Sequence, residues 1–363
     1  MKEIIIQCAL NGLSFGNVSY NILREIYEIG IPVSLFPKNQ NIDLSAYDSI
    51  SQEFTDWLQE SINRRNTSIK RDTPELNIWH FNGSESRISN NSILYTFHES
   101  SIPTEAELNL ANLYNKVIFS SNYSHEIFKS KGLNNSISIP IGFDKDFFET
   151  DRYKLPNKIH FGIMGKWESR KHTKKIIKLW SKKFGNDSRY ILTCLTDNPF
   201  LNEEELNSLK SSALNGEEYH NINFLNRIDT NSQVNQYLNS IDIDLGGLSG
   251  AEGWNLPSFN ATCLGKWSIV LNHTAHKDWA NKDNSILVEP SGQSSISDSK
   301  FFFEGSEFNQ GQKFSFTEQQ FNEATELAIS KCKSKNTEGQ KLKEKFSYKN
   351  TTNKILDELL DIS

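Results

Sequence analysis

Short apolar runs alternate with amphipathic stretches along the first half of the chain. The amphipathic stretches at residues 18–30 and 124–131 predict helices, and Gly132 ends the second one. The apolar runs predict buried strands at residues 3–8, 32–36, 76–81, 93–97, 116–120 and 136–139. Alternation of strands and helices is typical of β-α-β units around a parallel sheet. This half is therefore predicted to be a doubly wound α/β sheet.

The same alternation returns in the second half after a break. Periodicity is lost over residues 140–156, which begin and end with proline. Further strands are predicted at residues 159–164, 190–195, 222–225, 243–245, 267–271 and 286–288. Residues 291–315 predict a long ordered loop, and helices are expected at 317–332 and 350–360.

These patterns predict an α/β chain of two Rossmann-like domains in series. The first domain is expected to cover residues 1–145 and the second residues 158–340, with a linker at 146–157. Residues 341–363 are a candidate for a C-terminal helix that packs back toward the first domain.

Composition narrows the class of protein. The 363 residues carry a net charge of −6, which gives no overall attraction to nucleic acid or anionic lipid. The four cysteines are isolated, which favours a reducing, cytoplasmic location over a disulfide scaffold. No run reaches the roughly 18 apolar residues of a membrane span, so stable membrane insertion is not expected. The sequence does not indicate an oligomeric state.

The most informative stretch is SGAEGWNLPSFNATCLG at residues 249–265, between a predicted strand and a predicted helix. In an open α/β sheet, such a loop lies where ligands bind. Its backbone N–H groups suit phosphate or hydroxyl oxygens, and Glu252 can accept hydrogen bonds from sugar hydroxyls. The alternative is an ordinary strand-to-helix turn with a capping acid.

This stretch resembles the E-G-(F/W)-G-x-P-x-x-E segment of the family 4 retaining nucleotide-sugar glycosyltransferases, which have the GT-B architecture of two Rossmann-like domains facing each other across a cleft. The resemblance implies that the first domain binds the acceptor and the second domain binds the donor. Glu252 matches the first glutamate, whereas Asn260 stands where the family has the second. The resemblance implies that Asn260 approaches the donor ribose, where its amide can accept one hydrogen bond. It also implies that the donor sugar is held by Glu252, Gly253, Trp254, Asn255 and Leu256.

A second segment, FGIMGKWESRK at residues 161–171, is similar to the loop that binds the donor pyrophosphate in that family. The resemblance implies that Lys166 and Lys171 stabilise the leaving diphosphate. A cation at ~4 Å contributes ~4 kcal/mol at an effective dielectric constant near 20. Taken alone, both would be solvated surface lysines. The basic helix that follows is expected to pack its apolar side on the sheet.

In the first domain, His98 lies at the carboxyl end of a predicted strand, in the segment TFHE. A lone histidine there is more often structural, but the resemblance places His98 beside the reacting sugar, with His80 as a weaker candidate. Gly16 resembles the family's glycine loop that closes over donor and acceptor, and a tight turn is the alternative. The base of a UDP or GDP donor is expected near Asn226, Arg227 and Ile228.

Two patterns suggest metals but are set aside. Asp242 and Asp244 spell D-x-D within or beside a strand, and the resembled family needs no metal. His273 and His276 have H-x-x-H spacing without a third ligand that the sequence can place. No metal and no cofactor apart from the nucleotide-sugar substrate are expected.

The resulting hypothesis is a metal-independent, retaining hexosyl- or pentosyltransferase that acts on an unidentified acceptor hydroxyl of a glycan, lipid-linked glycan, protein or modified DNA base. One alternative is a glycosyltransferase acting on hydroxymethylated DNA bases, suggested by the basic cluster Arg64, Arg65, Lys70 and Arg71. Residues 1–150 nevertheless carry 12 basic and 18 acidic side chains, unlike a duplex-binding surface. The other alternative is a non-catalytic partner protein that binds sugar nucleotides, suggested by Asn260.

Overall fold

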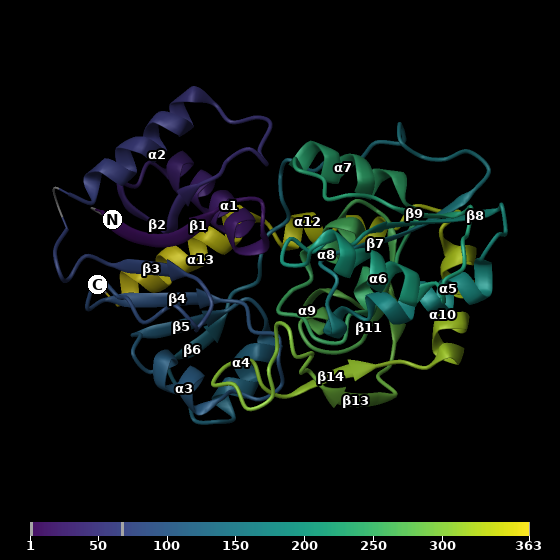
Figure 1. The fold of residues 1–363 in the computed structure, drawn as a ribbon. Helices are drawn as coiled ribbons and strands as arrows, with labels where there is room; N and C mark the ends of the chain where they lie inside the picture. Colours follow the sequence, from purple (N-terminus) through teal and green to yellow (C-terminus); the bar gives the residue numbers. More distant parts are fainter. Residues whose placement is uncertain (1–2, 67–68, 363) are drawn as a thin grey trace.

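The computed structural model describes residues 3–66 and 69–362. Two α/β halves lie side by side, each built around its own six-stranded parallel sheet (Figure 1). The predicted fold class is therefore confirmed. The domain boundaries stay predictions, and residues 1, 2 and 363 of the predicted end segments lie outside the described residues.

The first sheet has the strand order β2-β1-β3-β4-β5-β6. Its strands are β1 (Ile4–Leu10), β2 (Val33–Ile42), β3 (Glu75–Ile78), β4 (Ser92–Thr96), β5 (Lys116–Phe119) and β6 (Ser136–Ser138). Its helices are α1 (Ser14–Ile29), α2 (Gln52–Arg64), α3 (Glu105–Ala111) and α4 (Asn122–Lys129). Strands β1, β3 and β4 are buried throughout, and burial on both faces explains the largely apolar run of β1.

The second sheet has the order β12-β11-β10-β7-β8-β9. Its strands are β7 (Ile159–Met164), β8 (Tyr190–Leu195), β9 (Ile222–Phe224), β10 (Ile243–Asp244), β11 (Trp267–Leu271) and β12 (Ile286–Val288). Its helices are α5 (Thr173–Phe184), α6 (Glu203–Ala213), α7 (Asn231–Ser240), α8 (Leu256–Cys263), α9 (His276–Trp279) and α10 (Glu318–Lys331), with short 3-10 turns η1 (Ser169–Lys171) and η2 (Gly246–Leu248). As expected, α5 buries Ile176, Ile177 and Trp180 in the core of this half.

Strand order identifies where a ligand would bind. In the second sheet the order reverses between β10 and β7, which pair side by side although they are far apart in the sequence. In open α/β sheets, ligands bind outside the carboxyl ends of the strands at such a reversal. The loops after β7 and β10 hold the lysine pair and Glu252, respectively.

Residues 292–315, here called the strap, differ from the predicted loop. They begin with β13 (Gly292–Ser295) and end with β14 (Gln312–Ser315), which pair antiparallel. The middle of the strap reaches the first half, where Ile102 N–H donates to Gln310 O at 3.2 Å and Asn309 N–H donates to Glu107 Oε1 at 2.8 Å. Because β13 is exposed and polar, it lacks the apolar alternation that predicts a strand.

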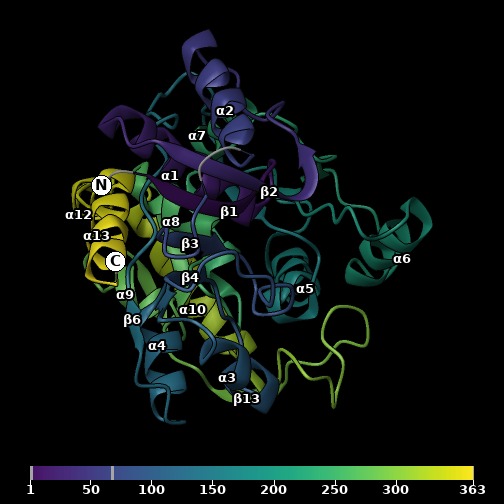
Figure 2. The ribbon, with the colours of Figure 1, turned by 90° about the vertical axis from the view of Figure 1, so that its left-hand side faces the viewer.

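The chain returns to the first half at its C-terminal end. After α11 (Thr337–Gln340) and α12 (Leu342–Lys345), helix α13 (Tyr348–Asp361) packs against α1, as Figures 1 and 2 show. Phe143 N–H donates to Phe346 O at 2.7 Å, next to this contact. Within the described ranges, no helix is long and apolar enough to cross a membrane.

Candidate functional site

The turn after β7 places the side chain of Lys171 against the backbone of Gly165. Gly165 has φ of 140°, a conformation that favours glycine. A Cβ at this position would lie 3.4 Å from Cδ of Lys171, the last residue of η1. The side chain of Lys171 therefore runs directly beside the glycine turn that ends the strand.

Lys171 and Glu252 form a close ion pair between the loops after β7 and β10. Lys171 Nζ lies 2.5 Å from Glu252 Oε1, and Arg170 Nη1 lies 3.3 Å from Glu252 Oε2. Glu252 is only 4% exposed. Burial would raise the pKa of Glu252, but the charges of Lys171 and Arg170 outweigh it and hold that pKa below its usual value. Glu252 is therefore a carboxylate at neutral pH.

Arg170 ties this pair to the first half of the molecule. Its buried guanidinium donates to Ala251 O at 2.6 Å and lies 2.8 Å from Glu168. It also lies 2.9 Å from Glu99, which follows β4 of the first sheet. Sequence reasoning did not select Arg170, because no local pattern separates it from its basic neighbours.

Lys166 is the most exposed cation of this group. Its Nζ lies 3.1 Å from Glu168 Oε1, and its side chain is 38% exposed. The ammonium also lies over the ring of Phe200, 5.3 Å from the ring centre. Three cations thus face three carboxylates, and Lys166 is the one with most surface left for a ligand.

The loop after Glu252 packs against the first half. Gly253 O accepts a hydrogen bond from Ser120 Oγ at 2.8 Å. A Cβ on Gly253 would lie 3.1 Å from Cβ of Phe97 and 3.3 Å from the backbone N of His98. This close approach favours glycine at the contact.

The start of α8 is fixed by buried polar contacts. Asn255 adopts φ of 67°, and its Nδ2 donates to Gly246 O at 3.1 Å and to His276 Nε2 at 2.9 Å. Leu256 begins the helix, and Asn260 lies one turn later on the same side. Asn260 is 7% exposed, and its Oδ1 has no hydrogen-bond partner within the described part of the chain. Trp254 is buried beneath this turn, 5.3 Å from the ring of Phe259.

The side chain of His98 points into the first half. Its Nε2 lies 3.3 Å from Glu107 Oε2 and 3.1 Å from Ser100 Oγ, and its ring meets Phe128 edge-on at 4.8 Å. The backbone N and O of His98 each lie 3.3 Å from the position of a Cβ on Gly253. His80, at the end of β3, instead packs its ring 4.2 Å from that of Phe15.

Gly16 lies inside α1, which begins four residues earlier than predicted. A Cβ on Gly16 would lie 2.3 Å from Asn11 O, so the turn before α1 requires glycine there. The segment Asn226, Arg227 and Ile228 lies between β9 and α7, and Arg227 N–H donates to Asp197 Oδ2 at 3.0 Å. The ligand roles of these residues stay predictions.

The side chains of the D-x-D and H-x-x-H patterns make structural contacts. Asp242 Oδ2 accepts a hydrogen bond from His160 N–H at 2.9 Å, and Asp244 is buried in β10. His276 holds Asn255, whereas His273 stacks on Phe314 at 3.4 Å. Across the residues that the structure describes, no group of three or more His, Cys, Asp or Glu side chains is placed to hold a metal ion.

Comparisons with known proteins show similarity in structure alone. No family model and no curated protein matches the sequence. A sucrose-phosphate synthase from Thermosynechococcus elongatus is similar with a TM-score of 0.71, 12% identity and 100% of both chains covered. Anabaena HepE in complex with UDP-glucose has a TM-score of 0.65, 13% identity, and coverage of 99% of this chain and 100% of its own.

A glycosyltransferase from Rickettsia africae is also similar, with a TM-score of 0.67, 12% identity, and coverage of 99% of this chain and 98% of its own. Each similarity extends over both sheets, so it concerns the arrangement of the two halves as well as each half. This chain therefore has the GT-B fold, with two Rossmann-like domains.

Proposed function

We propose that this protein is a retaining glycosyltransferase that transfers a sugar from a nucleoside diphosphate sugar to an acceptor hydroxyl. The observation that carries the proposal is the Lys171–Glu252 pair beside the partly exposed Lys166 at the strand reversal of the second sheet. Cations and an ionised acid at this position suit a diphosphate and a hydroxylated sugar.

In the proposed reaction, the bond from the anomeric carbon to the phosphate oxygen breaks, and its electron pair leaves with the diphosphate. Lys166 and Lys171 neutralise the charge that develops there. The acceptor oxygen bonds to the same face of that carbon, and its proton passes to the departing phosphate oxygen. Glu252, kept ionised by Lys171 and Arg170, accepts hydrogen bonds from the sugar hydroxyls.

UDP is the nucleotide we favour over GDP, because a protein of similar fold, Anabaena HepE, was solved in complex with UDP-glucose. The unpartnered Oδ1 of Asn260 is a suitable acceptor for a ribose hydroxyl. Asn226, Arg227 and Ile228 would lie near the base. We propose that the reaction needs no metal ion and no cofactor besides the donor substrate.

The proposal is tested by incubating the protein with UDP- and GDP-sugars and a panel of glycan, lipid-linked, peptide and hydroxymethylated DNA acceptors. Mass spectrometry would identify a glycosylated product, and NMR would give its anomeric configuration. We expect transfer from a UDP-sugar with retention, unchanged by EDTA. Tight UDP-sugar binding without transfer or hydrolysis would instead identify a non-catalytic binder, and an inverted product would refute the mechanism.

A further inference from the structure

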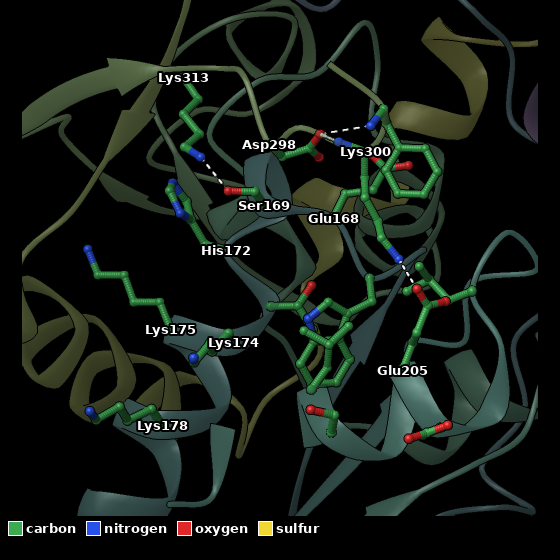
Figure 3. Close-up of a pocket in the computed structure, with 17 residues that line it drawn as sticks. Glu168, Ser169, His172, Lys174, Lys175, Lys178, Glu205, Asp298, Lys300 and Lys313 are labelled. Atoms are coloured by element: carbon green, nitrogen blue, oxygen red, sulfur yellow. Dashed lines mark hydrogen bonds and ion pairs between the residues drawn. The ribbon is translucent and has the colours of Figure 1, made fainter. Parts of the chain in front are cut away.

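A cavity lies beside the loop after β7, between helices α5 and α6 and the strap (Figure 3). Its volume is about 840 Å³. Its apolar lining comes from Trp167, Leu201, Leu209 and Phe301. Glu168 and Ser169 also line it, whereas Lys166, Lys171 and Glu252 do not. The cavity therefore adjoins the proposed donor site without containing its ligand-binding groups.

Four lysines of this cavity have no carboxylate partner within 4.0 Å among the residues that the structure describes. These are Lys174, Lys175, Lys178 and Lys313. Lys174 Nζ donates to Ser212 Oγ at 2.6 Å, Lys175 Nζ donates to Ser315 Oγ at 2.8 Å, and Lys313 Nζ donates to Ser169 Oγ at 2.5 Å. Lys175 Nζ also donates to Phe316 O and lies over the ring of Phe316, 4.3 Å from its centre. None of these partners carries a negative charge.

Most acids of the cavity are already engaged, as Figure 3 shows for Asp298 and Glu205. Glu205 forms an ion pair with Lys300, and Glu168 pairs with Arg170. Asp298 Oδ1 accepts from three consecutive backbone N–H groups, those of residues 300–302. Glu204 and Asp298 have no cation partner within 4.0 Å in the described part of the chain, yet five lysines against four carboxylates leave the lining with a small excess of positive charge.

The start of α5 adds to this excess. Its first turn contains no acidic residue, and His172 at its N-cap makes no side-chain capping bond. Lys174 and Lys175 therefore stand at the positive end of the helix dipole, where cations are unfavourable. Burial, followed by the charges of Lys175 and Lys313, lowers the pKa of His172 to about 4. The surroundings favour a bound anion over any further cation.

We propose that this cavity binds an acidic saccharide, with its sugar rings against Phe301 and its anionic groups at the four lysines. The volume is far larger than one inorganic oxyanion and falls in the range of sites for multi-ring ligands. Aromatic faces pack against the apolar faces of sugar rings, and ammonium groups bind carboxylate, sulfate or phosphate oxygens. The choice of a saccharide rests on the proposed function, for which a glycan is acceptor or product.

The test is calorimetric titration of the full chain with a sulfated hexasaccharide, with maltohexaose as the neutral ligand and sodium sulfate as the small anion. The variant is Lys174→Ala/Lys178→Ala. Its charge-matched control is Lys182→Ala/Lys282→Ala, since Lys182 pairs with Glu318 outside the cavity and Lys282 is exposed. Circular dichroism would verify that both fold.

We expect the sulfated hexasaccharide to bind the parent and the control equally, and the cavity variant about tenfold more weakly. Maltohexaose should bind at least tenfold more weakly than the sulfated ligand. Equal binding by the cavity variant, or equal binding of maltohexaose, overturns the proposal. Sodium sulfate binding as tightly as the hexasaccharide overturns the saccharide assignment, because the cavity is then a simple anion site.

A parallel titration with UDP keeps the two proposals apart. Saturating UDP should leave hexasaccharide binding unchanged, and displacement by UDP would refute a separate site. A protein that binds the hexasaccharide but neither binds UDP nor transfers sugar would contradict the proposed function while supporting this cavity.

Discussion

At the scale of single residues, the three cations after β7, Lys166, Arg170 and Lys171, differ in how much of their surface a ligand can reach. Arg170 is 4% exposed and forms ion pairs with three acids, Glu168, Glu99 and Glu252. It therefore has little surface left for contact with a ligand. Lys171 has one carboxylate partner, and Lys166 is more than one-third exposed. The lysines are therefore the cations that a diphosphate can recruit.

We predict that Lys166→Ala and Lys171→Ala each lower the single-turnover rate by ~10²-fold, because each removes charge that stabilises the leaving group. Lys182→Ala, which removes an equal charge from the exposed part of α5, should keep the parent rate. Near-parent rates in both loop variants would remove these lysines from the mechanism. Thermal unfolding would show whether Lys171→Ala also lowers the stability of the protein by leaving the buried Glu252 without this partner.

The sequence could predict some of this cluster but not its centre. Glu252 and Lys171 stand in recognisable loops, each between a strand and a helix, and the structure brings them into contact. Arg170 and Glu99 come from different halves of the chain, and only the tertiary arrangement pairs them. The direction of the His98 side chain was likewise not predictable, because it depends on Glu107 in α3.

At the scale of elements, buried strands were predicted best. The bounds of β7, β8, β11 and β12 agree with those expected from the sequence, because their apolar runs are set by burial in the second core. The strap shows the opposite case. Its two strands pair with each other at the surface, and its contacts with Ser101 and Ile102 involve residues about 200 positions away.

His172 gives the strap a predicted pH dependence. Its Nε2 donates to Phe314 O at 2.6 Å, and burial together with nearby lysines lowers its pKa to about 4. Between about pH 6.5 and pH 4 the unfolded chain therefore binds a proton that the folded chain does not. Stability should fall as pH decreases through this range, by roughly 3 kcal/mol from this residue.

The variant His172→Gln can still donate to Phe314 O but does not titrate. We expect its free energy of unfolding, measured by urea denaturation, to change less between pH 7 and pH 4.5 than that of the parent. An identical pH dependence in both proteins would rule out His172 as a source.

At the scale of the whole molecule, the backbone at Gly142 packs directly against the backbone at the start of the C-terminal helix α13. A Cβ there would lie 2.2 Å from the backbone N of Tyr348, the first residue of α13. We predict that Gly142→Ala lowers the free energy of unfolding by roughly 1–3 kcal/mol, because backbone must move to admit the methyl group. Gly292→Ala, where a Cβ meets nothing within 4 Å, is the matched control. Equal stability of both variants in urea denaturation would contradict this close backbone contact.

The last prediction concerns the Glu99–Arg170 ion pair, which joins the two domains. Glu99→Gln can still accept a hydrogen bond from Arg170 but removes the carboxyl group that pairs with Arg170 between the two domains. Arg170 keeps Glu168 and Glu252, so UDP binding to the second domain should change less than about twofold. Turnover should fall by roughly five- to tenfold, since about 1 kcal/mol of interdomain attraction no longer holds the first domain against the loop after β7. Glu126→Gln, which neutralises an exposed acid of the same domain, should leave both quantities at parent values. Parent turnover in Glu99→Gln, or a loss of UDP affinity as large as the loss of turnover, would show that this pair does not couple the domains.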